Sequence, residues 1–352
     1  MAMDIYRFPM SYGVVTDGGK RFLGLVNSDG ESAFVLYDLE ENDIIHKFQY
    51  MDTRNWRLNK QLEDHPTGVS DKGAYFVSDY LLSEEQGESF CKPCGMEVRA
   101  YDKEGGRLCA TIPVSEGYKE WPLNCRLLDM AKLEDGFYLV IFSEKMRSER
   151  DFVVALYDGQ SGESGELWRS TGHQMRYFDV AYHPETRIIT VKKAEEFFYD
   201  VFDKNEYDLY TLQLSEDYGE ITLLSEEKIT RVESESNPLP GLTSQKQKRG
   251  LLRGKLHRYV DDATGQVLLE MKEGMNTVCE YIAIPGLNSL VLERSGVMGG
   301  GATYYVIVGT DSGYELAETI EMNSAARIRY DEEEGWIALV GAEESVVLRH
   351  KA

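Results

Sequence analysis

The amino-acid sequence predicts an all-β fold, and within that class a seven-bladed β-propeller of four-stranded antiparallel blades. Two observations lead to this prediction. Segments in which β-branched and aromatic residues alternate with other residues follow one another along nearly the whole chain. A strand-and-turn unit also recurs at intervals of roughly 50 to 65 residues, which suits blades that carry loop insertions. Two β-sandwich domains are the alternative, although they would need no regular period.

The recurring unit is an apolar run that ends in Tyr-Asp and leads into a turn of glycine and small polar residues. It is clearest at 155–163, where Ala-Leu-Tyr-Asp precedes Gly-Gln-Ser-Gly-Glu. The same pattern stands at 35–38 and 98–102, and looser forms stand at 259–262 and 308–311. Because glycine and small polar residues favour tight turns, each unit predicts a turn between two strands.

Short apolar runs divided by turn residues define the expected strands of the first four units. In the first two units we expect strands at 18–26, 33–37 and 44–48, and then at 68–70, 74–77, 98–101 and 108–112. In the third and fourth we expect them at 127–131, 136–141, 153–157 and 166–168, and then at 178–182, 188–191, 208–212 and 221–224.

The later units are less even. The fifth is visible mainly as 255–259 and 266–271, and the sixth is complete. The last unit lacks one strand, and we expect an N-terminal strand around 5–8 to supply it and close the ring, which removes exposed sheet edges. The strands of the sixth and last units are expected at 278–282, 289–293, 303–308 and 316–320, and at 326–330, 335–340 and 346–349. We therefore predict one domain over 1–352, with a loop insertion or disordered segment near 230–254.

The chain resembles the WD-repeat-like propeller superfamily, in the broad sense that includes YVTN-like blades. Tyr37-Asp38, Tyr101-Asp102 and Tyr157-Asp158 stand where such families often have an aromatic residue followed by Asp. A Gly-His pair occurs once, at 172–173, and a Trp-Asp pair is missing from the sequence. The resemblance implies the propeller architecture over nearly the whole chain, and it carries no catalytic residue over.

Composition places the chain among globular proteins and narrows its partners. Hydrophobic residues make up 42% and charged residues 28%, and the formal net charge is -23. A strongly negative field disfavours binding to nucleic acid or anionic lipid, since phosphate contacts need a cationic surface. We therefore predict a protein partner and no nucleic acid.

The cellular location is predicted from two kinds of segment that the sequence lacks and from its cysteines. It has neither an apolar run of the roughly 20 residues that a membrane helix needs nor an N-terminal secretory pattern. Its five cysteines are odd in number and do not suggest a disulfide framework. We expect a cytoplasmic protein that does not enter a membrane.

The longest insertions are expected on one face of the propeller, between the third and fourth strands of their blades. They are 82–96, 144–151, 194–207 and 295–302. Long loops on a rigid scaffold are where binding usually resides. The 195–203 segment mixes acids with aromatic residues, which either pack against the blade or form a contact surface. Its candidate partner-binding residues are Phe197, Phe198, Tyr199 and Phe202.

A basic stretch follows Pro238, Pro240 and Gly241 and is therefore expected to be a loop. The stretch provides a cationic surface for an acidic partner or, less readily, for a nucleic acid. Alternatively, it contacts acidic residues of the chain itself. The stretch contains Lys246, Lys248, Arg249, Arg253, Lys255 and Arg258, of which Lys248, Arg249 and Arg253 are the candidate partner-binding residues.

Motifs for chemistry are weak. Cys91 and Cys94 form a Cys-x-x-Cys pair on an expected loop, with spacing that suits zinc or redox chemistry. One such pair supplies only two of four zinc ligands, and no strand-to-helix element follows it. The sequence contains neither a Ser elbow nor His-Glu-x-x-His. His173 and His183 are read as packing or loop histidines rather than bases.

The sequence therefore favours a non-catalytic interaction scaffold, or recognition subunit, of a cytoplasmic complex. The alternative is a propeller-type hydrolase or lactonase with a divalent cation at the central channel. We predict no organic cofactor and no catalytic residue, and a divalent cation belongs to the alternative alone.

Overall fold

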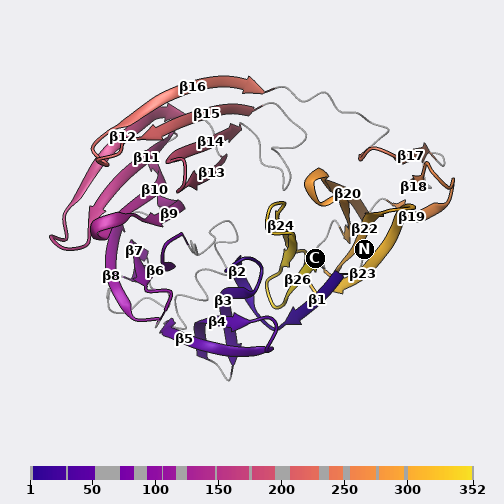
Figure 1. Ribbon diagram of the computed structural model, residues 1–352, viewed down its shortest axis with the longest axis horizontal. Helices are drawn as coiled ribbons and strands as arrows, with labels where there is room; N and C mark the ends of the chain where they lie inside the picture. The colour runs from indigo at the N-terminus through magenta and orange to yellow at the C-terminus, as the bar shows by residue number, and fades with distance from the viewer. Residues whose placement is uncertain are drawn as a thin grey trace. The chain divides into compact units, whose positions relative to one another are not determined.

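The computed structural model is built almost entirely of strands (Figure 1). Its helical content within the described residues is two short 3-10 turns, η1 (Glu134–Gly136) and η2 (Pro285–Leu287), neither of which could span a membrane. The structure describes residues 3–28, 31–51, 72–82, 93–104, 106–115, 125–146, 149–173, 177–194, 207–229, 238–248, 254–274, 277–296 and 300–350.

Seven antiparallel sheets follow one another along the chain, and each is made of strands that are neighbours in sequence, except that the last sheet also takes in the first strand of the chain. This is the blade organisation of a seven-bladed β-propeller, so the predicted fold class is confirmed. The chain divides into two compact units. The terminal unit comprises Met1–Phe22, Leu39–Glu41 and Val232–Ala352, and the middle unit comprises Leu23–Asp38 and Asn42–Arg231.

The first four sheets contain fifteen described strands. The first sheet is β2 (Ser11–Thr16), β3 (Arg21–Ser28), β4 (Glu31–Asp38) and β5 (Asp43–Met51), and the second is β6 (Tyr75–Leu82), β7 (Pro93–Tyr101) and β8 (Leu108–Ser115). The third is β9 (Cys125–Lys132), β10 (Phe137–Met146), β11 (Glu149–Asp158) and β12 (Ser164–His173). The fourth is β13 (Tyr177–His183), β14 (Ile188–Ala194), β15 (Tyr207–Leu214) and β16 (Ile221–Ile229).

The last three sheets belong to the terminal unit. The fifth is β17 (Leu242–Lys248), β18 (Lys255–Asp261) and β19 (Val267–Glu273), and the sixth is β20 (Thr277–Ile284), β21 (Ser289–Gly296), β22 (Ala302–Thr310) and β23 (Gly313–Met322). The seventh is β24 (Arg327–Asp331), β25 (Trp336–Val340), β26 (Ser345–His350) and β1 (Met3–Phe8).

The predicted pairing of the N-terminal strand with the last unit is confirmed. Strand β1 lies antiparallel to β26, from Met3 opposite His350 to Phe8 opposite Ser345, and the two are side by side in Figure 1. The buried Ser345 hydroxyl donates a hydrogen bond of 2.8 Å to the backbone oxygen of Met10, just beyond β1. This pairing covers the edge that β26 would otherwise expose.

Two sequence expectations need correction. Residues 242–248 were expected to lie in a loop, but they form β17, which pairs with β18 from Leu242 opposite Asp261 to Lys248 opposite Lys255. The 144–151 segment is also not a long loop. Strands β10 and β11 extend through it and are joined by 147–148 alone. The first sheet gains β2, which the alternation pattern did not reveal.

Apolar clusters between consecutive sheets form the core. In the middle unit, Phe76 and Val98 of the second sheet pack with Tyr138 and Val140 of the third. In the terminal unit, a second cluster of buried side chains joins the fifth and sixth sheets, and a third joins the sixth and seventh. Each fully buried aliphatic or aromatic side chain contributes about 1.5 to 3 kcal/mol relative to an exposed one. The apolar residues that alternate along each strand therefore lie on the faces that pack against neighbouring sheets.

Each sheet has two distinct ends. In an antiparallel meander, the connections from first to second strand and from third to fourth lie at one end, here called the turn end. The connection from second to third strand lies at the other, here called the loop end. In the second and fifth sheets, of which three strands are described, the end with the Asp102 or Asp261 turn is the turn end and the opposite end is the loop end. The long connections 195–206 and 297–301 join the second to the third strand of their sheets, and 83–92 joins the first two of the three described strands of the second sheet, so their predicted place between third and fourth strands is wrong.

The turn ends are closed by a repeated hydrogen-bonded turn. Asp102, Asp158, Asp261 and Asp331 each accept, at the backbone oxygen, a hydrogen bond from the glycine N–H four residues later. Their carboxylates accept further hydrogen bonds from the turn, as Asp158 does from the Ser161 hydroxyl at 2.8 Å. These contacts explain the recurring Asp and Gly of the sequence. They stabilise the turn and leave the aspartates structural.

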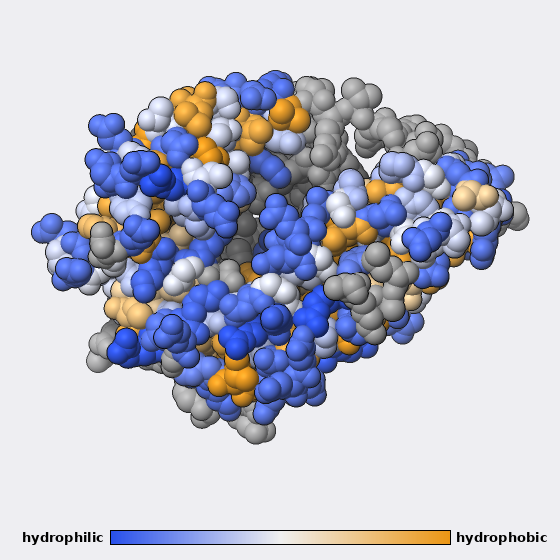
Figure 2. Space-filling model, in the orientation of Figure 1, coloured by the Kyte–Doolittle hydropathy of each residue, from blue (hydrophilic) through white to orange (hydrophobic). Residues whose placement is uncertain are grey.

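The exposed apolar residues are scattered. In Figure 2 hydrophilic residues cover most of the face in view, with hydrophobic ones in small separate groups. Among the described residues, the large exposed apolar side chains are Ile5, Ile45, Leu108, Leu223, Leu224, Val267, Leu316 and Tyr330. They come from seven different strands, which is the ordinary distribution for a protein surface rather than one extended apolar patch.

Candidate interaction surface

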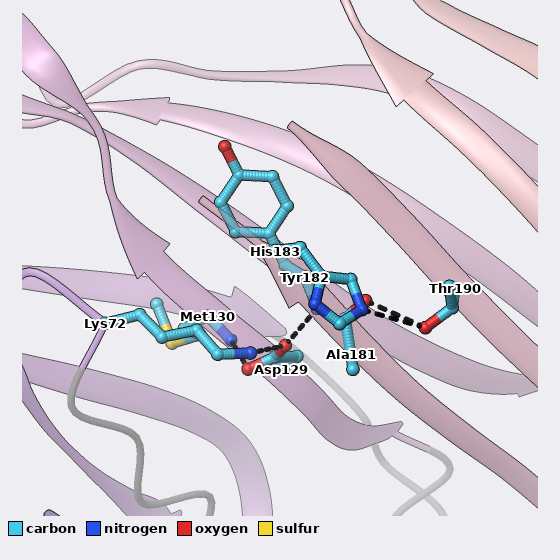
Figure 3. A network of polar contacts seen from close by, with 7 residues as sticks. All are labelled: Lys72, Asp129, Met130, Ala181, Tyr182, His183 and Thr190. Atoms are coloured by element: carbon cyan, nitrogen blue, oxygen red, sulfur yellow. Dashed lines mark hydrogen bonds and ion pairs between the residues drawn. The ribbon is translucent and has the colours of Figure 1, made fainter. Parts of the chain in front are cut away.

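The buried carboxylate of Asp129, on β9, is the centre of the polar network in Figure 3. Its Oδ1 accepts a hydrogen bond of 2.8 Å from the Met130 backbone N–H. Its Oδ2 accepts one of 2.7 Å from the Tyr182 backbone N–H and also receives the Lys72 ammonium group. Both oxygens are therefore engaged by donors of the chain itself.

This network links three consecutive sheets of the middle unit. Lys72 precedes β6 of the second sheet, Asp129 lies on the third, and Tyr182 lies on the fourth. The Lys72 backbone oxygen also accepts a hydrogen bond of 2.9 Å from Lys132. Charge-assisted hydrogen bonds of this kind are the strong ones. Asp129 is thus placed to fix the sheets together.

His183 stands beside this network but has a different partner. Its Nε2 lies 3.4 Å from the Thr190 hydroxyl oxygen, and that hydroxyl donates to the Ala181 backbone oxygen (Figure 3). The imidazole is exposed at the turn end of the fourth sheet. His183 is thus an exposed residue at the end of β13, neither packed in the core nor in a loop, and its reading as a structural histidine stays a prediction.

The loop end of the fourth sheet carries a buried lysine. The Lys193 ammonium group donates to the Tyr210 hydroxyl at 3.2 Å and lies 3.8 Å from an Asp208 carboxylate oxygen. Burial, followed by the hydrogen bond and charge of Glu226, raises the pKa of Tyr210 to about 12. Lys193 is the next-to-last residue of β14, so its charged group lies next to the start of connection 195–206.

Of the predicted partner-binding residues, only Lys248 lies within the described residues. Phe197, Phe198, Tyr199 and Phe202 belong to connection 195–206 and lie outside the described residues. In the fifth sheet, Lys248 ends β17, while the predicted Arg249 and Arg253 follow it in connection 249–254, again outside the described residues.

The Cys-x-x-Cys pair does not lie in one loop. Cys94 belongs to β7, whereas Cys91 lies outside the described residues. Within the ranges that the structure describes, no group of three or more His, Cys, Asp or Glu side chains is arranged to hold a metal ion. The metal hypothesis for Cys91 and Cys94 stays a prediction.

Three described residues of the basic stretch, Lys246, Lys248 and Lys255, lie on one face of the fifth sheet, whereas Arg258, opposite Gln245 and Glu270, lies on the other. Lys246 is opposite His257, and Lys248 is opposite Lys255, in the β17–β18 pairing. Residues directly opposite in a sheet share a face. On the next strand, Lys255 is opposite Glu273. We call these residues, together with Arg294, the basic cluster.

The same face packs against the sixth sheet. Tyr259 is two residues from His257 and Met271 is two residues from Glu273, so both lie on the face of the basic cluster. They belong to the apolar core with Leu290 and Leu292. The half-buried Cys279 of β20 joins this core, and Arg294 stands opposite it on β21. The basic cluster therefore occupies the loop end of the junction between the fifth and sixth sheets.

Glu273 is the carboxylate within the basic cluster. It lies 2.7 Å from the buried His257 Nε2 through one oxygen and 3.1 Å from the Lys255 ammonium through the other. Burial raises the pKa of the Glu273 carboxyl, but the hydrogen bonds from His257 and Lys255 outweigh it and leave that pKa below its usual value. Glu273 is therefore held ionised by the basic groups around it.

A second titratable pair lies on the opposite face of the sixth sheet. Glu280 on β20 and Glu293 on β21 are directly opposite each other, and Tyr304 is opposite Glu293 on β22. Burial and the Glu280 charge raise the pKa of Glu293, against lowering hydrogen bonds from Ser295 and Tyr304. Like charges directly opposite in a sheet are destabilising, so this pair has a cost in the folded state.

Sequence reasoning missed Asp129, Lys193, His257, Glu273 and the Glu280–Glu293 pair. A signal existed for Asp129, because an acid inside the apolar run Leu-Leu-Asp-Met-Ala must find partners when buried. The others become visible only through strand register. Lys246 and His257, for instance, are neighbours because β17 and β18 pair as they do.

No family model and no curated protein matches the chain. Several solved structures are similar to the chain. U3-55K has 8% identity and a TM-score of 0.43, with 99% of this chain and 98% of that chain covered. The Dos1 propeller has 13% identity and a TM-score of 0.35, with 96% and 82% covered. A prolyl endopeptidase has 11% identity and a TM-score of 0.42, with 95% covered, and this chain spans 44% of its length.

Proposed function

We propose that the protein is a non-catalytic interaction scaffold, the recognition subunit of a protein complex, and that partners bind at the loop ends of its sheets. The difference between the two ends of the sheets carries the proposal. Connections 83–92, 116–124, 195–206 and 249–254 start and finish at loop ends. The turn ends are closed by short turns whose aspartates are hydrogen bonded internally. Long connections on a rigid scaffold are the usual place for binding.

The charges of the described residues support the same end. Lys193 with Asp208, and Lys255 with Glu273, stand at loop ends next to these connections. Exposed apolar residues are scattered. A partner held here would therefore rely on polar and aromatic contacts, which transient protein interfaces combine.

The test is affinity capture from the native lysate with matched loop and turn variants. We expect a stoichiometric partner that survives moderate salt. Phe197→Ser/Phe198→Ser/Phe202→Ser, or replacement of 195–206 by a short turn, should abolish capture. Replacing turn 215–220 of the same sheet by a short turn should leave capture intact. Thermal unfolding checks that each variant is folded.

A monomer that captures no partner would contradict the scaffold proposal. Capture unchanged by variants of 83–92, 195–206 and 249–254 would contradict the placement of the binding surface at the loop ends.

One observation favours the second candidate, a hydrolase or lactonase that uses a divalent cation. Glu280 and Glu293 place two carboxylates opposite each other, and a perturbed pKa beside a second acid is typical of functional sites. Under this hypothesis, calcium, magnesium or manganese should raise the melting temperature, because a ligand that binds only the folded state stabilises it. The shift should vanish in Glu280→Gln/Glu293→Gln. If no divalent ion shifts the melting temperature, this candidate is excluded.

A further inference from the structure

The basic cluster gathers basic side chains from three strands of two sheets. Lys246 and Lys248 come from β17, Lys255 and His257 from β18, and Arg294 from β21. Lys255 is about half exposed (49% of its side chain), and Lys246 and Arg294 are exposed. The cluster is therefore open to solvent at its rim and anchored by the buried His257 at its base.

The geometry around Cys279 ties these groups together. Burial, followed by the charge of Glu273, raises the pKa of the Cys279 thiol to about 11, while Arg294 and Lys255 act in the opposite direction. Arg294 is directly opposite Cys279 in the β20–β21 pairing, and Cys279 packs against the core that contains Tyr259 and Met271, so Arg294 lies at the same junction of the fifth and sixth sheets as Lys255 and Glu273.

The cluster is short of negative charge. Both oxygens of Glu273 are engaged by His257 and Lys255. No ion pair joins Lys246 or Arg294 to another residue in the described part of the chain. In a chain with 61 acidic and 38 basic residues, such a concentration of cations is unusual.

Building on the proposed scaffold function, we propose that the basic cluster binds an acidic, glutamate- or aspartate-rich peptide segment of a protein partner. Carboxylates would pair with the exposed Lys246 and Arg294 and supply the counter-charge that Glu273 provides only in part. A duplex nucleic acid fits less well. Strong nucleic-acid binding needs many phosphate contacts across an extended cationic surface, and the described exposed cations of this cluster are Lys246, Lys255 and Arg294 alone.

Fluorescence anisotropy with labelled peptides tests the proposal on the full chain. The probes are a glutamate-rich peptide, its glutamine counterpart and a single-stranded oligonucleotide of matched charge. We expect the glutamate peptide alone to bind, with an affinity that falls as salt rises. Lys246→Gln/Arg294→Gln removes two charges without touching the Glu273 contacts. It should weaken binding by about tenfold or more, since hydrogen bonds to charged groups are strong.

The matched control is Lys47→Gln/Lys272→Gln. Both of these lysines are exposed, and Lys272 lies opposite Leu256 on the other face of the fifth sheet. The control removes the same net charge, so it should change affinity by about twofold at most. Equal losses in the two double variants would show a general charge effect and overturn the site. Tighter binding of the oligonucleotide, or no binding of the glutamate peptide, would overturn it as well.

Partner capture separates this proposal from the scaffold function. If a partner is captured and lost on changing 195–206 but unaffected by Lys246→Gln/Arg294→Gln, the scaffold stands and the acidic-segment site falls. If the glutamate peptide binds as expected while no partner is captured, the site stands and the scaffold proposal falls.

Discussion

At the scale of single residues, Asp129 shows how a buried charge in this chain is made structural. Its side chain is 8% exposed and receives two backbone N–H groups and the Lys72 ammonium. An isolated carboxylate in such surroundings would be costly, and the three donors offset that cost. The same logic holds for Glu273 with His257 and Lys255. The carboxylates of both acids are hydrogen bonded to groups of the chain itself, so we interpret them as structural.

Removing the Asp129 carboxylate should destabilise the middle unit strongly. We expect Asp129→Ala to cost about 3 kcal/mol or more, because it leaves the Lys72 charge and two backbone donors without their acceptor. Urea unfolding measures the change. In a double-mutant cycle with Lys72→Met the two effects should be markedly non-additive. Additive effects would mean that the two side chains do not interact.

Neutralising Glu293 should stabilise the protein at neutral pH. The folded-state pKa of Glu293 is raised, so the folded state binds its proton more tightly than the unfolded state does. Stability is therefore lost as pH rises from the unfolded pKa of 4.5 through the raised folded value. Glu293→Gln does not titrate, so its advantage in melting temperature should grow across that window and then stay constant.

The control for this effect is Glu343→Gln, which replaces an exposed acid. It should change the free energy of unfolding by no more than about 0.5 kcal/mol. Glu280→Gln should reproduce part of the Glu293→Gln gain, because it removes the repelling charge while leaving Glu293 buried. A melting temperature that falls in Glu293→Gln at neutral pH would contradict the predicted direction.

At the scale of elements, the turns join neighbouring sheets as well as neighbouring strands. In the terminal unit, the Asp261 carboxylate caps its own turn through the Thr264 N–H and hydroxyl and also lies against Gly313, which begins β23. Close by, the Tyr314 hydroxyl donates to the Pro240 backbone oxygen at 2.8 Å and contacts Asn288. A turn of one sheet thus contacts the turn of the next sheet.

Gly313 is the sharpest test of this junction. Its φ of +132° is a conformation that side chains rarely adopt, and a Cβ there would stand 2.6 Å from an Asp261 carboxylate oxygen. We expect Gly313→Ala to destabilise by about 2 kcal/mol or more in urea unfolding. Gly265→Ala is the control, because Gly265 also has positive φ but open space around it. Equal costs at the two sites would show that the close contact contributes nothing.

At the scale of the whole molecule, the first and last strands of the chain belong to one sheet. Strand β1 pairs with β26, and Arg349 of β26 also reaches Glu40 at 2.7 Å and lies over the Tyr6 ring. Contacts between residues so far apart in sequence form late and carry a large loop-closure cost. The completeness of the seventh sheet therefore depends on both termini.

Deleting residues 1–8 should expose the edge of β26 and promote association. We expect a lower melting temperature and concentration-dependent oligomers in size-exclusion chromatography. A synthetic peptide of residues 1–10 should restore the melting temperature in trans, whereas a scrambled peptide should not. A truncated chain that stays monomeric and equally stable would show that β1 is dispensable.

The sequence by itself determined the class of fold, most strand positions and the pairing of the termini. Alternation and turn residues are local properties, so the run at 155–163 already specifies β11, its turn and the start of β12. Residues 242–248 escaped this reasoning because Thr-Ser-Gln-Lys-Gln-Lys is polar on both faces, and pairing with β18 makes it a strand. The tertiary structure alone decided that Asp129 meets Tyr182 and that His257 and Lys255 meet Glu273. Such contacts depend on which sheets pack together and in which register, and these are properties of the folded chain as a whole.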